Sequence, residues 1–155
     1  MKLSNRCRYA TIALFDIAFH NNGKPTQVRQ IAQRQNIPGR FLEQIFHDLR
    51  RAELVDGKRG RNGGYFLHRS PSEITLTDII EATDGPIELS FANHDSSTSG
   101  PGQPVTPTQT IPVAVWGEIS DRIRGIYTDY TLEDLVERAK EAGLDRNAPG
   151  FMYFI

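Results

Sequence analysis

The stretch from residue 25 to residue 66 constrains the fold more than any other part of the chain; it is PTQVRQIAQRQNIPGRFLEQIFHDLRRAELVDGKRGRNGGYF. Apolar residues recur at helical spacing on both sides of a break at Asn36-Ile37-Pro38-Gly39, where turn residues and a proline interrupt the pattern. A glycine-rich basic segment then lies between two short runs of β-forming residues. This order predicts a helix, a tight turn, a second helix and a hairpin.

The second of these helices, predicted over residues 39–52, separates an apolar stripe from a polar face. The stripe contains Phe41, Leu42, Ile45, Phe46 and Leu49, and the polar face contains Arg40, Glu43, Gln44, His47, Asp48, Arg50 and Arg51. A second amphipathic helix that follows a short helix and a tight break has the geometry to lie in the major groove of DNA. The polar face is therefore the candidate DNA-contacting surface.

The glycine-rich segment, residues 56–64, predicts a hairpin tip between short strands at residues 54–55 and 65–67. Glycines allow positive φ and a close approach of the backbone to another surface, while Lys58, Arg59 and Arg61 bring positive charge to the tip. A phosphate-binding loop for a nucleotide is the competing interpretation. The segment lacks the Gly-x-x-x-x-Gly-Lys-Ser/Thr pattern and does not open a helix, so we set a nucleotide site aside.

Charge is distributed unevenly along the chain, although the net charge is only -1. Residues 1–70 hold 13 Lys and Arg against 5 Asp and Glu, whereas residues 71–155 hold 5 against 14. A basic half favours a polyanionic partner, and an acidic half favours a part that stays off nucleic acid. Chance segregation of solvated surface charge is the simpler alternative.

Composition and motifs exclude several other classes of protein. The chain has one cysteine, Cys7, so it forms no internal disulfide and no cysteine cluster for zinc or an iron-sulfur centre. No nucleophile-base-acid set stands out, so we expect no enzyme. No apolar run approaches the roughly 20 residues that a membrane helix needs, and no secretory signal is evident. We therefore expect a cytoplasmic protein.

The flanking segments predict further helices. Residues 4–20 form an apolar, helix-compatible segment with Ser4 as N-cap, and Thr26 is the expected N-cap of the next helix. Thr75 or Thr77 begins a helix that ends near residue 84, and Thr131 and Asp134 form a capping box for a last helix to about residue 142. Residues 92–110 are too polar to build a core and predict a loop, and the apolar tail, residues 151–155, is expected to dock on this chain or a partner.

A long helix is predicted from Pro112, a favourable first helical residue, to about Tyr130. Its apolar residues recur at three and four residues and make a narrow seam of Val113, Trp116, Ile119, Ile123, Ile126 and Tyr130. Such a seam fits a dimer interface, although a helix folded back on its own domain would show the same period. The domain organisation that follows is a DNA-binding domain over 1–90, a flexible loop over 91–111, and a dimerisation helix with a last helix and tail over 112–155.

These motifs in series resemble the IscR/CymR/NsrR-type winged helix-turn-helix transcription regulators. The resemblance rests on MKLSNRCRYA, RQIAQRQNIPGRFLEQIFHDLRRAELV, RGRNGGYFL, ITLTDIIEATDG and WGEISDRI followed by YTLEDLVE, and it covers about residues 1–137. It implies a mainly α fold with a small β-hairpin wing and a long C-terminal dimerisation helix. The expected function is sequence-specific binding of a pseudo-palindromic operator by a homodimer.

The resemblance also implies roles for individual residues. By position, base contacts fall on Arg40, Glu43, Gln44 and Arg59, whose side chains suit guanine, cytosine, adenine and a narrow minor groove respectively. Phosphate contacts are expected around them, from Thr26, Gln27, Arg50, Arg51, Lys58 and Arg61. The expected dimer interface contains Trp116, Ile119, Ile123, Ile126 and Tyr130.

Many members of the resembling family hold an iron-sulfur cluster on three cysteines between the fourth helix and the dimer helix, and this interval contains no cysteine here. We therefore expect no metal and no cofactor, and a small molecule or a protein partner as effector. Two alternatives stay open. The first is a redox, metal or iron-sulfur sensor that uses a non-standard intersubunit site at Cys7 and His94, and the second is a winged-helix protein-interaction module without DNA binding.

Overall fold

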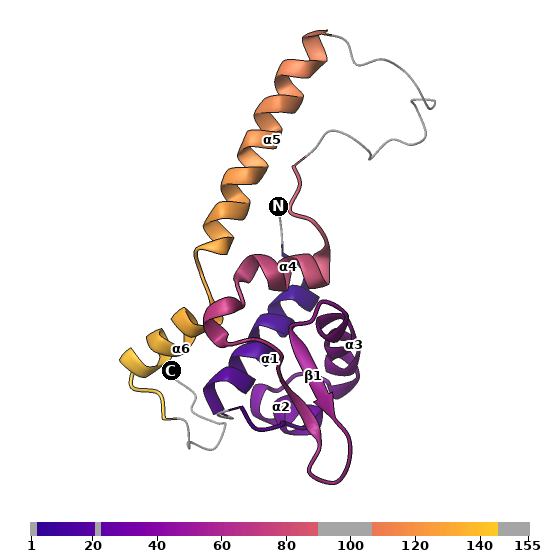
Figure 1. Cartoon of the computed structure of the whole chain (residues 1–155), viewed down its shortest axis with the longest axis vertical. Coiled ribbons are helices and arrows are strands. Elements are labelled where there is room, and N and C mark those ends of the chain that lie inside the picture. Colours follow the sequence, from indigo (N-terminus) through magenta and orange to yellow (C-terminus); the bar gives the residue numbers. More distant parts are fainter. Residues whose placement is uncertain (1–2, 21–22, 90–106, 146–155) are drawn as a thin grey trace.

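The computed structural model describes residues 3–20, 23–89 and 107–145. Its helices are α1 (Asn5–His20), α2 (Val28–Gln35), α3 (Gly39–Arg51), α4 (Leu76–Asp84), α5 (Pro107–Thr128) and α6 (Leu132–Glu141), with a short 3-10 turn, η1, at Pro71–Glu73. The strands β1 (Val55–Lys58) and β2 (Gly64–Leu67) pair antiparallel into one hairpin. The structure confirms the predicted fold class, which is mainly helical with a two-stranded wing (Figure 1).

The core forms where the apolar faces of α1, α2 and α3 meet the start of the wing. Its fully buried members include Leu14 and Ile17 from α1, Ile31 from α2 and Phe46 from α3. Ile45, Phe46 and Leu49 lie on the predicted stripe of α3, because residues three and four apart share one face of a helix. Residues from β1, α4 and α6 close the same cluster, which therefore joins the three helices, the wing and the two later helices.

Extended residues before α4 and α6 hold these two helices together. The Leu76 amide donates to the Tyr130 carbonyl at 2.9 Å, and the Leu132 amide donates to the Ile74 carbonyl at 2.9 Å. Thr75 caps α4 through Asp78, and Thr131 caps α6 through Asp134, each in a reciprocal capping box. The predicted box at Thr131 is therefore confirmed, and of the two candidate caps for α4 the structure selects Thr75.

Helix α5 leaves the domain and projects away from it, with the wing tip at the other end of the molecule (Figure 1). Its C-terminal part contacts the domain. There Thr77 donates to the Arg124 carbonyl at 3.1 Å, and Ile123 and Tyr127 pack against a small cluster of Cys7, Ile80 and Ile87. The predicted helix thus exists, but part of its predicted seam faces its own chain.

The structure corrects two predicted helix starts. Thr26 does not cap α2, because its backbone pairs with Tyr65 of the wing and Gln27 takes the N-cap position instead. Helix α5 begins at Pro107 and not at Pro112, which lies inside the helix. Pro107 offers the same favourable first helical residue, and one internal proline removes only one backbone hydrogen bond near the helix start.

Several predictions fall outside the described residues. They concern the apolar tail at residues 151–155, His94, and most of the loop predicted over residues 92–110. Within the residues that are described, no helix combines the length and the apolar character that crossing a membrane requires.

Candidate nucleic-acid interface

Helix α3 presents a polar face to solvent because its apolar residues, on the other side, are buried in the core. Leu42, Ile45, Phe46 and Leu49 are buried on one side. The opposite side exposes Arg40, Glu43, Gln44, His47, Arg50 and Arg51. Phe41 is 49% exposed at the edge of this surface, so its predicted place on the buried stripe is wrong. The three predicted base-contacting residues of this helix therefore share one exposed surface, as an element that enters a major groove requires.

The turn between α2 and α3 places the two helices as a helix-turn-helix. Asn36 adopts the left-handed conformation, with φ of 51°, and ends α2. The Ile37 side chain is buried, and its amide donates to the Ala32 carbonyl at 3.1 Å. Pro38 then stands as the N-cap of α3, where the missing amide hydrogen costs no helical hydrogen bond. The break seen in the sequence is thus the turn of the motif.

The wing is docked on the helix-turn-helix by its own backbone. Thr26 and Tyr65 exchange two backbone hydrogen bonds, of 2.8 and 2.7 Å, and the Tyr65 ring stacks on Phe46 of α3 with ring centroids 4.5 Å apart. The amide of the Gln27 side chain donates to the Arg61 carbonyl at 3.3 Å, which joins the start of α2 to the wing tip. These contacts fix the position of the basic tip relative to α3.

The cations of the wing all face solvent. The tip exposes three cations, Lys58, Arg59 and Arg61. Arg50 of α3 extends toward the wing, where its Nη1 atom would lie 4.0 Å from a Cβ atom added to Gly57. Arg50 therefore makes the polar face of α3 continuous with the charge of the hairpin. Guanidinium and ammonium groups in such an array suit the phosphates beside a groove.

Two predicted phosphate contacts at the start of α2 differ in exposure. Gln27 lies on the surface, whereas Thr26 is 1% exposed and its hydroxyl has no hydrogen-bond partner among the described residues. Its backbone pairing with Tyr65 holds the Thr26 side chain inside. The phosphate contact of Thr26 stays a prediction, and the role that the structure gives this residue is to anchor the wing.

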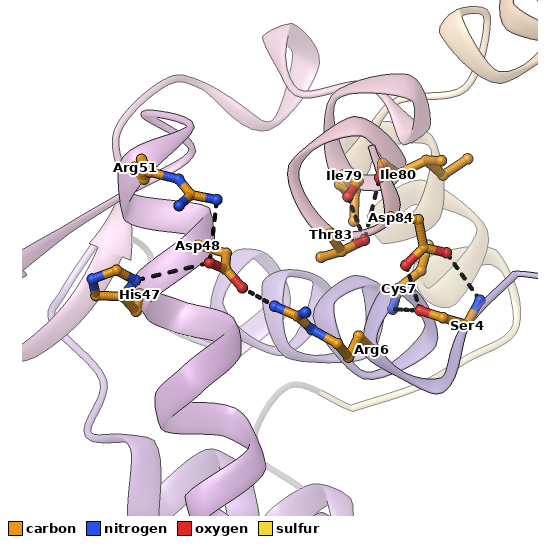
Figure 2. Close-up of polar contacts among 10 residues, drawn as sticks. All are labelled: Ser4, Arg6, Cys7, His47, Asp48, Arg51, Ile79, Ile80, Thr83 and Asp84. Atoms are coloured by element: carbon orange, nitrogen blue, oxygen red, sulfur yellow. Dashed lines mark hydrogen bonds and ion pairs between the residues drawn. The ribbon is translucent and has the colours of Figure 1, made fainter. Parts of the chain in front are cut away.

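The sequence did not predict the acidic centre on the flank of α3. Asp48 lies with its side chain 13% exposed and forms an ion pair with Arg6 of α1 (Figure 2). Arg51 lies 3.5 Å and His47 3.8 Å from the same carboxylate. Arg6 and Asp48 are 42 positions apart in the sequence, so no local sequence pattern predicts their ion pair. It adds the first turn of α1 to the surface formed by α3.

The first turn of α1 is also tied to the end of α4. The backbone amide of Ser4 donates to Asp84 at 3.0 Å, and its hydroxyl bonds to the same carboxylate while accepting from the Cys7 amide at 3.1 Å (Figure 2). The predicted capping role of Ser4 is confirmed. Arg6 therefore extends from a turn that is fixed on both sides, toward α4 and toward α3.

Cys7 lies inside the molecule, 2% exposed. Burial raises the pKa of its thiol above the ordinary value of 9.0, against the opposing effect of a hydrogen bond with Thr83. A protonated, buried thiol is a poor metal ligand and a poor nucleophile. No group of three His, Cys, Asp or Glu side chains that could hold a metal ion occurs in residues 3–20, 23–89 and 107–145.

The free face of α5 is unusually apolar for a helix in solvent. Ile126 is 58% exposed and Trp116 37%, and Ile111, Val113 and Val115 are also exposed, as is Tyr130 just beyond the helix. Ile119 is half-buried, and Ile123 packs on the cluster around Cys7. Of the predicted dimer residues, Trp116, Ile126 and Tyr130 are therefore exposed among the residues that the structure describes, and Ile123 packs against its own domain.

Comparisons with known proteins agree with this arrangement. The model of the Rrf2 family, described as an iron-dependent transcriptional regulator, matches residues 3–138. The HTH-type transcriptional regulator IscR of Photorhabdus laumondii is 35% identical over 136 residues, which are 88% of this chain and 79% of that protein.

Two solved structures share the fold. CymR, the global cysteine regulator of B. subtilis, superposes with a TM-score of 0.70 at 31% identity over 89% of this chain and 98% of that one. IscR of T. potens gives a TM-score of 0.69 at 30% identity over 94% and 93% of the two chains.

Proposed function

Because the chain belongs to the Rrf2 family of transcriptional regulators, which are DNA-binding proteins and not enzymes, we propose that it binds a pseudo-palindromic operator as a homodimer. In this proposal each protomer places α3 in the major groove and its wing beside the adjacent minor groove. The effector is a small molecule or a protein partner.

One observation carries the proposal. The exposed face of α3 and the cations of the wing form one surface, because the backbone pairing of Thr26 with Tyr65 and the stack of Phe46 on Tyr65 hold the hairpin beside the helix. An isolated polar helix would be ordinary solvated surface. A polar helix with a rigidly attached basic hairpin is suited to contact a groove and a backbone together.

Within this surface we assign two kinds of contact. Arg40, Glu43 and Gln44 on α3 and Arg59 at the wing tip contact bases or a narrow minor groove. Gln27, Arg50, Arg51, Lys58 and Arg61 contact phosphates and fix the register of the protein on the duplex. Thr26 supports this second group from beneath through its pairing with Tyr65.

The homodimer uses the apolar face of α5. A helix that projects from its domain with Val115, Trp116 and Ile126 exposed, and with Tyr130 exposed just after it, gains stability by packing on a second copy. Ile119 joins this interface, and Ile123 supports it by holding α5 on the cluster of Cys7, Ile80 and Ile87. Two-fold symmetry then presents two α3 helices to two half-sites.

Iron chemistry is not part of this proposal, although the description of the family includes it. The described residues offer no set of three metal-binding side chains, and the one cysteine is buried and protonated. This donor set does not fit a cluster or an iron ion held by one protomer. The intersubunit site at Cys7 and His94 stays a prediction, since His94 is outside the described residues.

The proposal is tested by selecting the sequences that the purified protein retains from fragmented genomic DNA. We expect enrichment of one motif with two half-sites related by a dyad, and affinity that falls steeply as salt rises. Retention of DNA without sequence preference, or of none, would contradict it and would favour a protein-interaction module.

A further inference from the structure

We propose that Arg6 of α1 is a phosphate contact on the flank of α3 opposite the wing, and that Asp48 is the residue that positions it. The inference rests on the proposed function and extends the DNA-binding surface to an element outside the helix-turn-helix and the hairpin. It starts from the ion pair of Arg6 and Asp48 and from the surface on which that pair lies (Figure 2).

The first step is the position of Asp48 around the axis of α3. Arg50 faces the wing, with its Nη1 atom near Gly57. Asp48 precedes Arg50 by two residues, which is about 200° of rotation in an α-helix. Asp48 and the Arg6 side chain bound to it therefore lie on the flank of α3 that faces away from the wing.

The second step is that Arg6 borders the same depression as the predicted base contacts. This open depression, of about 710 Å³, is lined by Arg6 on one side and by Arg40, Glu43, Gln44 and His47 of α3 on the other. A ligand that meets the polar face of α3 over this depression also meets the Arg6 guanidinium.

The third step is the fit to DNA. The major groove is about 12 Å wide, and an α-helix with its side chains is about 10–12 Å across, so the groove walls stand close to both flanks of an inserted helix. The wing and Arg50 meet the phosphates of one wall. Arg6 is a cation from outside α3 on the flank that faces the other wall, where Arg51 of α3 also lies 3.5 Å from the Asp48 carboxylate.

The fourth step is the state of the Arg6 side chain. It is 53% exposed, whereas the Asp48 side chain beneath it is 13% exposed. A guanidinium has five N–H donors in a planar fork, so one edge can bind Asp48 while other donors stay available to a phosphate oxygen. Fixing Ser4 to Asp84 holds the turn that carries Arg6, which lowers the entropy lost on binding.

A competing role for Arg6 is to neutralise Asp48, whose carboxylate would otherwise repel phosphates. The two roles make different predictions when Asp48 carries no charge. The experiment measures the affinity for the selected operator duplex by fluorescence anisotropy at several salt concentrations. It compares the native protein, R6Q, D48N and the double variant R6Q/D48N, with K140Q as the matched control because Lys140 is an exposed cation on α6.

We expect R6Q to lower the slope of log affinity against log salt by about 0.9 for each protomer on the operator, in the Asp48 and in the D48N background alike. Base preference should stay unchanged, and K140Q should match the native slope. R6K keeps the charge, so it should keep the slope. A slope that R6Q leaves unchanged in the D48N background, or a changed base preference, overturns the proposal.

Folding and DNA binding are controlled separately. The double variant R6Q/D48N removes both partners of the ion pair and leaves no unpaired charge, so it keeps the test valid if R6Q alone unfolds. A native protein whose DNA affinity does not depend on salt would contradict the proposed function itself. If operator binding depends on salt but R6Q leaves the slope of log affinity against log salt unchanged, the role of Arg6 is contradicted and the proposed function is not.

Discussion

Gly64 of the wing lies so close to Thr26 that a Cβ on this glycine would stand 2.3 Å from the Thr26 carbonyl oxygen. Gly64 also has φ of 150°, inside the region that side-chain-bearing residues rarely adopt. The contact exists because the backbones of the hairpin and of the α2 N-terminus are paired there. A residue without a Cβ is therefore required at position 64 for the wing to dock on the start of α2.

We expect Gly64→Ala to lower the free energy of unfolding by about 3 kcal/mol, because the new methyl group must push the two paired backbones apart in a strained conformation. Urea denaturation followed by circular dichroism measures the loss. Gly57→Ala is the matched control, since its Cβ would make an ordinary 3.5 Å contact with the Tyr65 ring. Equal stability of the two variants would mean that the wing is not docked as described.

We expect Gln44→Ala to weaken operator binding by about 1–3 kcal/mol and to relax base preference at one position in each half-site, because the amide pairs with a base edge. Arg50→Gln should instead weaken all duplexes alike and lower the salt slope. Binding to a library with randomised half-sites separates the two results. A Gln44 variant that keeps the native preference would remove this residue from the base contacts.

The sequence predicts the elements of this interface better than their connections. Helical spacing identifies the buried stripe of α3, except for the exposed Phe41, and its polar face. The short-range capping patterns at Ser4 and Thr131 are correct because both partners lie within one turn. The predicted N-cap at Thr26 is wrong because the backbone of Thr26 is hydrogen-bonded to Tyr65, 39 positions away in the sequence. The pair of Arg6 and Asp48 was missed for the same reason, since a long-range ion pair leaves no periodic pattern.

The seam of α5 shows a second limit of periodicity. Apolar residues that recur every three or four positions indicate that one face of the helix is apolar. They do not indicate whether that face packs on its own chain or on another. The structure divides the predicted seam, with Ile123 inside the Cys7 cluster and Ile126 in solvent.

Because Ile123 packs on its own domain and Ile126 is exposed, a substitution of Ile126 is the one that tests the dimer. We expect Ile126→Glu to yield a folded monomer and to lower operator affinity by about 100-fold or more, because each half-site is then bound independently. Light scattering and anisotropy measure the two effects. Gly125→Glu is the matched control, because it adds the same carboxylate one residue away, where a Cβ meets nothing within 4 Å. A dimer that survives Ile126→Glu would place the interface elsewhere.

Cys7 offers a test of whether the chain senses oxidants through its thiol. Its side chain is 2% exposed, and burial raises its pKa above the ordinary 9.0. Well below pH 9 the thiol is protonated in both the folded and the unfolded chain, so it contributes no pH dependence of stability there. Above that value the unfolded chain loses its proton first, and stability falls with rising pH.

We therefore expect a disulfide reagent at pH 8 to modify Cys7 at least about 100-fold more slowly in the native protein than in urea, because reaction requires local opening of the α1, α4 and α5 cluster. The release of the coloured thiolate measures both rates. Rapid modification of the native protein would contradict a structural role for this thiol and would restore the redox sensor as a candidate function.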